Sequence, residues 1–154
     1  MHIPDNYLSP TTCAVLAVAA APLVGLSITK VKAQLKENKE LAPMLGIAAS
    51  LSFLLMMFNV PIPGGTTAHA VGGVLLSILI GPYAASLALS VALLLQALLF
   101  GDGGILALGA NIFNMAIAMP FVGYAVYHFF RKQNHETAGV IVGSYVGINV
   151  AAFL

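Results

Sequence analysis

The chain has 154 residues, of which 60% are hydrophobic and only 7% are charged, and its mean hydropathy is +0.97. Water-soluble domains carry about a quarter charged residues, so this composition excludes a soluble fold and indicates a protein of the lipid bilayer. The net charge of +1 comes without a basic run, which excludes a nucleic-acid surface. The single cysteine, Cys13, excludes an internal disulfide and a Cys-rich zinc motif.

The apolar stretches of the chain favour helices. Backbone polar groups at membrane depth must be paired within the protein, so spans are helices or strands of a closed barrel. Barrel strands alternate apolar and polar residues, whereas a stretch such as 84–100 is apolar on all sides. We therefore expect an all-α, multi-pass transmembrane bundle, with an N-terminal arm over residues 1–10 and one helical domain over residues 11–154.

Six spans are expected in chain order. The arm contains two prolines and ends at Ser9-Pro10, an N-cap followed by a first-turn proline. The expected spans cover residues 11–29, 41–60, 68–80, 83–100, 111–130 and 137 onward, separated by a charged loop (30–40), a Pro/Gly-rich break (61–67), a Gly-rich loop (101–111) and a basic turn (131–136). The third span, at about twelve residues, is short for a full crossing of roughly 30 Å.

Positive residues set the expected orientation. They gather in loop 30–40, at Lys30, Lys32, Lys36 and Lys39, and again at Arg131-Lys132. Such residues mark the cytoplasmic side, which puts the N-terminus outside. The arm, the 61–67 break and the 101–111 loop then share the outer face.

Two of the four histidines lie on that outer side. His128 and His135 flank the basic turn and are expected at a solvated edge, whereas His2 lies on the arm and His69 just inside the third span. An imidazole at membrane depth is costly and often functional. A lone histidine can be a packing residue and an arm can be a surface tail, but two histidines on one face favour a site.

The position of His2 suggests a metal site. The Met1 amine, the deprotonated His2 amide and His2 Nδ1 could close a five-membered and a six-membered chelate ring, and His69 could add a fourth nitrogen. Because His2 is bulky, Met1 should escape methionine removal. Four nitrogens in a plane suit Ni(II) or Cu(II). The residues that could orient these ligands are Thr66, Thr67, Asp102, Asn111 and Asn114.

Several other features have simpler interpretations. Asp102 and Asn111 could equally be loop and N-cap residues, and Gln96 is expected to hydrogen-bond another helix. Small residues recur every fourth position, at Ala17, Ala21 and Gly25 and at Gly139, Gly143 and Gly147. This spacing lets helices approach closely, and it serves either internal packing, which we favour, or docking to a partner.

Catalytic motifs are absent from the sequence. It has no phosphate loop G-x-x-x-x-G-K-[ST], no H-E-x-x-H and no G-x-S-x-G. The chain is therefore not expected to be an enzyme. Active uptake would need an energy source on other subunits.

Three motifs together resemble a known family. Met1-His2-Ile3-Pro4-Asp5, the run from Thr67 to Gly73 (TAHAVGG), and Gly101-Asp102-Gly103-Gly104 leading to the run from Leu108 to Ala116 (LGANIFNMA) resemble the CbiM/NikM proteins. Those are substrate-binding (S) components of energy-coupling factor transporters for cobalt and nickel. The Pro-Asp arm and the Gly-Asp-Gly-Gly loop look more like the nickel branch.

The resemblance implies a site, a location and partners. The arm would enter the bundle from outside, and the metal would bind the Met1 amine, the His2 amide and imidazole, and the His69 imidazole. The location would be a bacterial or archaeal cell membrane. The partners would be a transmembrane coupling subunit, cytoplasmic ATPases and often a small accessory membrane protein.

Two departures from the family stand out. Asn6 replaces a usual glycine, although asparagine tolerates the left-handed bend. The chain also ends within its last span, whereas the family is usually longer, which suggests a truncated chain or a split subunit.

The leading hypothesis is a nickel-binding subunit of an ATP-driven importer. Its alternatives are the same role for Co(II), a passive metal channel acting alone, and a structural assembly subunit in which His2 and His69 are expendable. A passive channel would need polar residues along a path through both halves of the bilayer, and the cytoplasmic half offers few.

Overall fold

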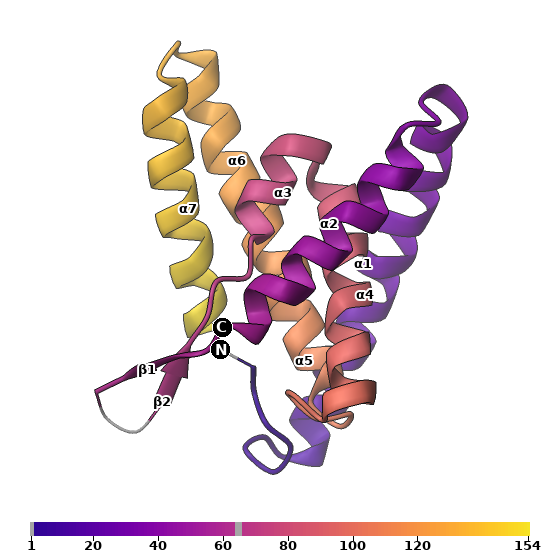
Figure 1. Cartoon of the computed structure of the whole chain (residues 1–154), viewed down its shortest axis with the longest axis vertical. Coiled ribbons are helices and arrows are strands. Elements are labelled where there is room, and N and C mark those ends of the chain that lie inside the picture. Colours follow the sequence, from indigo (N-terminus) through magenta and orange to yellow (C-terminus); the bar gives the residue numbers. More distant parts are fainter. Residues whose placement is uncertain (1, 64–65) are drawn as a thin grey trace.

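The computed structural model describes residues 2–63 and 66–154 and is a helical bundle with one short hairpin (Figure 1). Its elements are α1 (Pro10–Glu37), α2 (Leu41–Met57), β1 (Val60–Ile62), β2 (Thr66–Ala68), α3 (Gly73–Ile80), α4 (Pro82–Phe100), α5 (Leu108–Asn111), the π-helix η1 (Ile112–Ala118), α6 (Met119–Lys132) and α7 (Glu136–Phe153). The expected helical architecture is confirmed in outline. The hairpin was not expected.

In the part of the chain that the structure describes, four helical segments are long and apolar enough to cross a membrane by length and composition. They are α1, α4, the continuous run Leu108–Lys132 and α7. Helix α2 is slightly shorter, at 17 residues. Helix α3 has 8 residues, a length of about 12 Å against a hydrocarbon core of about 30 Å. Six crossings therefore stay a prediction.

Several expected boundaries were wrong. Helix α1 runs through the first lysines to Glu37, so most of the expected charged loop is helical. Helix α2 ends at Met57 rather than Val60, and the third helix begins at Gly73 rather than near Ala68. The intervening strands pair antiparallel, with Val60 opposite Ala68. The segment is extended because its prolines cannot donate a helical hydrogen bond and because their β-branched neighbours favour strands.

The fifth helical segment contains a π-turn. It begins at Leu108 rather than Asn111, and at the end of η1 the N–H of Met119, the first residue of α6, donates to the Asn114 carbonyl five residues earlier. Pro120 follows directly, and proline has no N–H for the carbonyl four residues earlier and would clash with it. The wider turn relieves that clash, and such turns are frequent near functional sites.

Small residues allow close helix packing in the second half of the chain. Gly139, Gly143 and Gly147 lie buried on the α7 face that contacts α6, and a Cβ on Gly143 would meet the Gly123 carbonyl oxygen at 2.7 Å. The internal packing expected for these glycines is confirmed. In α1, by contrast, Ala21 and Gly25 are exposed. Helix α4 forms the centre of the bundle and contacts α1, α2, α3 and η1.

The three polar segments meet at one end of the bundle. Figure 1 shows the arm, the hairpin and the α4–α5 loop at the lower end, with the α1–α2 and α6–α7 turns at the upper end. Ser9 caps α1 as expected, since its Oγ accepts from the Thr12 N–H at 3.1 Å. The predicted convergence of arm, break and Gly-rich loop is confirmed. The side of the membrane on which they lie stays a prediction.

Candidate metal centre

The arm is fixed to the bundle by one asparagine. The Ile3 N–H donates to Asn111 Oδ1 at 2.8 Å, and Asn111 Nδ2 donates back to the Ile3 carbonyl at 3.1 Å. These opposed bonds satisfy the backbone of the arm much as a neighbouring strand would. Asn111 Nδ2 also donates to the Gly103 carbonyl at 3.2 Å. Asn111 is therefore no simple helix cap, because it joins the arm to the Gly-rich loop.

A third hydrogen bond to the arm involves Asp5. Asp5 Oδ1 accepts from the Ala107 N–H at 2.9 Å. The loop comes this close because Gly103 and Gly104 have φ of +82° and +68° and no side chain. A Cβ on Gly103 would lie 2.7 Å from Asn111 Nδ2, and one on Gly104 would overlap the Asp5 carboxylate. The Gly-Asp-Gly-Gly sequence is thus shaped to receive the arm.

The bend of the arm is also preserved. Asn6 has φ of +78°, and the Tyr7 N–H reaches the Pro4 carbonyl at 3.4 Å across the turn. The expectation that asparagine accommodates the bend is confirmed. The chain therefore turns back from the site and enters α1.

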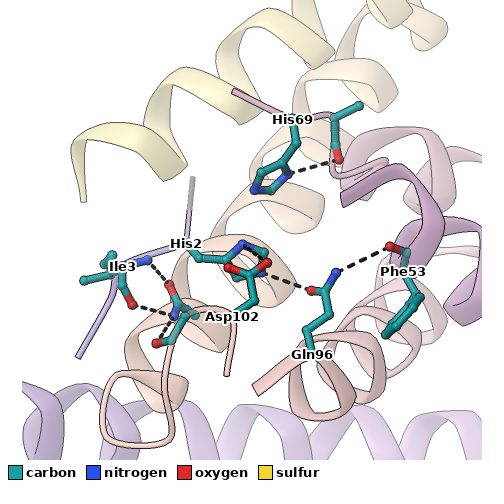
Figure 2. Close-up of polar contacts among 9 residues, drawn as sticks. His2, Ile3, Phe53, His69, Gln96 and Asp102 are labelled. Atoms are coloured by element: carbon teal, nitrogen blue, oxygen red, sulfur yellow. Dashed lines mark hydrogen bonds and ion pairs between the residues drawn. The ribbon is translucent and has the colours of Figure 1, made fainter. Parts of the chain in front are cut away.

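These contacts bring His2 deep into the bundle, with a side chain that is 5% exposed. Its Nε2 lies 3.1 Å from Gln96 Oε1, and its Nδ1 lies 3.4 Å from Asp102 Oδ2 (Figure 2). Burial lowers the pKa of His2, and the Asp102 carboxylate opposes that shift. The ring is therefore favoured in its neutral form, in which one nitrogen carries a lone pair.

His69 lies beside His2. It belongs to the extended segment between β2 and α3 rather than to a helix, and it is 7% exposed. The two ring centroids are 4.9 Å apart, and the His69 ring points toward His2 in Figure 2. The Nδ1 of His69 lies 3.2 Å from the Ala70 carbonyl, which can only accept, so Nδ1 carries the proton and Nε2 is the acceptor nitrogen.

A cavity of about 460 Å³ opens beside the two rings. It is lined by His2, Ile3, Pro4, Tyr7, Asn59, Thr67, His69 and Asp102. Over residues 2–63 and 66–154, no group of three or more His, Cys, Asp or Glu side chains is arranged to hold a metal ion. A metal bound here would need further ligands, such as backbone or terminal nitrogens.

Only some of the predicted site residues lie together at this cavity in the described part of the chain. His2, His69, Thr67 and Asp102 meet at the cavity, and Asn111 holds the arm there. Within the described part of the chain, no hydrogen bond joins the half-buried Asn114 side chain to this group. Met1 lies outside the described residues. Thr66 is described only through its backbone pairing with Ile62.

Two contributors were not assigned to the site from the sequence. Gln96 was expected only to hydrogen-bond another helix, which it does, since its Nε2 donates to the Phe53 carbonyl at 3.4 Å. Its contact with His2 was missed, and so was the role of Asp5. A lone amide in an otherwise apolar span was the available signal for Gln96.

Comparison with known proteins identifies the family. Residues 2–154 match the sequence model of CbiM, described as the cobalt uptake substrate-specific transmembrane region. The chain belongs to the CbiM family. Over all 154 residues, this CbiM-family chain is 66% identical to the probable fused nickel transport protein LarMN of Lactiplantibacillus plantarum, covering 47% of that protein.

Two further comparisons extend this picture. Over 138 residues the CbiM-family chain is 33% identical to the cobalt transport protein CbiM of Clostridium tetani, covering 90% of this chain and 57% of that protein. The crystal structure of a truncated transition metal transporter matches with a TM-score of 0.91 and 52% identity, over 99% of this chain and 71% of that one. The chain thus spans about half the length of these two curated relatives.

Proposed function

We propose that this chain captures Ni(II) as the substrate-binding subunit of an ATP-driven importer. The metal would bind the Met1 amine, the His2 amide, His2 Nδ1 and His69 Nε2. The observation that carries the proposal is the insertion of the arm, which brings the His2 ring to 4.9 Å from that of His69 inside the bundle. His2 directly follows the residue that carries the terminal amine, and a histidine so close to the chain terminus has little reason to be buried there unless the amine is used.

The chemistry of the donors favours nickel. Four nitrogens in a plane suit Ni(II), whereas zinc prefers a tetrahedron and magnesium prefers oxygen ligands. The 66% identical relative LarMN is named for nickel transport. The cobalt-named relative from Clostridium tetani is more distant, at 33% identity. Co(II) is the second candidate cargo, and the binding experiment below compares the two.

The proposal includes a topology of six crossings with the N-terminus outside. Support comes from the basic residues, which lie at the end of the bundle opposite the arm (Figure 1). Helix α3 alone is too short to cross, but the extended residues that precede it include the buried His69 and Val71. Non-helical backbone is tolerated at membrane depth when protein covers it. The extended segment and α3 would together form the third crossing.

Energy for uptake would come from partner subunits, because the sequence contains no phosphate-loop motif. The expected partners are a transmembrane coupling subunit and cytoplasmic ATPases, with a small accessory membrane protein in some assemblies. Metal would be captured outside and released inward when ATP hydrolysis drives a rearrangement. Uptake of radioactive nickel by cells that express the chain with and without these partners tests this part. Equal uptake in both would instead support a passive channel.

Metal binding tests the site itself. Affinities for Ni(II) and Co(II) would be measured on purified protein with a free N-terminus and compared with His2→Ala, His69→Ala and one alanine inserted before Met1. His128→Ala is the matched control, because His128 is exposed in α6 at the opposite end. We expect the first three changes to abolish tight Ni(II) binding and the control to preserve it. Unchanged affinity after the insertion would refute the amine-and-amide chelate.

A further inference from the structure

Gln96 is a fully buried amide in the apolar helix α4, with an exposed fraction of 0%. It contacts two other parts of the chain, the Phe53 carbonyl at the end of α2 and the His2 ring on the arm (Figure 2). A buried amide without such partners would cost several kcal/mol in an apolar environment. Each of its two contacts therefore constrains the orientation of the amide group.

The partner on α2 decides which end of the amide faces His2. The Phe53 carbonyl can only accept a hydrogen bond, so the NH₂ group of Gln96 must face it. The oxygen Oε1 then faces His2 Nε2 at 3.1 Å. Since that oxygen can only accept, the neutral His2 ring must carry its proton on Nε2. Its lone pair is then on Nδ1.

We infer that Gln96 is a positioning residue, which fixes the tautomer of His2 so that Nδ1 is the nitrogen offered to a metal ion. The use of that nitrogen for nickel rests on the proposed function, but the tautomer itself does not. A chelate that starts at the terminal amine and the His2 amide can close a six-membered ring only through Nδ1. The opposite tautomer would first have to lose the Nδ1 proton.

Asp102 favours the opposite tautomer, because its carboxylate could accept a proton from Nδ1. That contact is longer, at 3.4 Å, and the Asp102 side chain is 34% exposed, whereas Gln96 is fully buried. The shorter, buried contact should dominate. Two acceptors, the Nδ1 lone pair and the carboxylate, would then face each other. A cation beside them would relieve that repulsion.

The backbone of Gln96 supports the same arrangement. Its carbonyl accepts from the N–H groups of Gly101 and Asp102, which close the C-terminal turn of α4. One residue therefore contacts His2 through its side chain and holds Asp102 through its backbone. Substitution of the side chain leaves the turn intact, which makes a clean experiment possible.

The test reads the tautomer directly in metal-free protein. With ¹⁵N-labelled histidine, the shifts of the two ring nitrogens of His2 distinguish the protonated from the unprotonated atom, at a pH where the ring is neutral. His2→Ala assigns the signal. A proton on Nε2 in the unaltered protein supports the inference, and a proton on Nδ1 overturns it. Because no metal is present, this result does not depend on the proposed function.

Variants then test whether Gln96 is responsible. Gln96→Met keeps the length of the side chain without its polar atoms. We expect a mixture of His2 tautomers in this variant, with a larger population of the form protonated on Nδ1 than in the unaltered protein. Gln96→Glu, in its protonated form, can donate to Phe53 and accept from His2, so it should restore the Nε2 proton. Ser90→Ala is the control, because Ser90 lies in the same helix and its side chain, over residues 2–63 and 66–154, bonds only to the Ser86 carbonyl. An unchanged tautomer in Gln96→Met would overturn the role of Gln96.

Nickel affinity completes the experiment. Loss of a group that orients a metal ligand typically lowers affinity about 10- to 100-fold. We expect a loss in that range for Gln96→Met, partial recovery for Gln96→Glu and no change for Ser90→Ala. Absence of nickel binding in the unaltered protein would refute the proposed function, whereas equal affinity of Gln96→Met and unaltered protein would refute the role of Gln96.

Discussion

Replacing Asn111 by alanine should release the arm. Asn111 makes two hydrogen bonds to the backbone of Ile3 and one to Gly103. A hydrogen bond of this kind contributes about 0.5–1.5 kcal/mol net, so the two bonds to the arm stabilise its docked position by about 1–3 kcal/mol. If metal binds only to the docked arm, the affinity for Ni(II) should fall about 5- to 150-fold, at 1.4 kcal/mol per factor of ten.

Calorimetry on the purified protein measures this loss, and digestion of the metal-free arm by an aminopeptidase reports docking separately. Asn149→Ala is the matched control, because the half-buried Asn149 side chain, among the described residues, bonds only to the Tyr145 carbonyl within α7. We expect faster digestion of the arm and weaker Ni(II) binding in Asn111→Ala but not in Asn149→Ala. Unchanged affinity together with unchanged protection of the arm would refute the idea that Asn111 holds it.

Three further predictions follow from the same geometry. In Gly104→Ala the new Cβ would overlap the Asp5 carboxylate at a φ of +68°, so arm docking should weaken by at least about 1–2 kcal/mol, and aminopeptidase protection would be lost. Gly143→Val should destabilise the α6–α7 contact by about 1–3 kcal/mol, measured by thermal unfolding. Gly25→Ala should leave the stability unchanged, because a Cβ on Gly25 would meet no atom within 4 Å. Equal stabilities of the two variants would contradict this packing. Burial lowers the pKa of His2 below the usual 6.5, so the folded protein binds fewer protons there than the unfolded chain. Protection of the arm should therefore be complete above pH 6.5 and decline as the pH falls below it, and a rise in protection at low pH would show that the sign is wrong.

The sequence predicts the architecture well where the chemistry is local. Uninterrupted apolar runs give the long helices, and Ser9-Pro10 marks the start of α1 correctly. The loop predicted after Thr29 was wrong, because lysine and glutamate are good helix formers and α1 extends through them to Glu37. The hairpin was missed because its strands have only three residues each.

Part of the site was also predictable. The cost of histidine in an apolar chain singles out His2 and His69. Their rings do lie together, and their role as metal ligands stays a prediction. The roles of Asn111, Gln96 and Asp5 depend on contacts across 108, 94 and 102 positions of sequence. No local pattern carries that information. It emerges only when the Gly-rich loop folds against the arm.

The coordination of bound nickel tests the central claim most directly. We expect Ni(II) added to protein with a free N-terminus to give a yellow, diamagnetic complex, with four nitrogen ligands and no oxygen in its X-ray absorption spectrum. Such a complex should not form when one residue precedes Met1. A paramagnetic, six-coordinate nickel with oxygen ligands would contradict the planar site formed by the arm and His69.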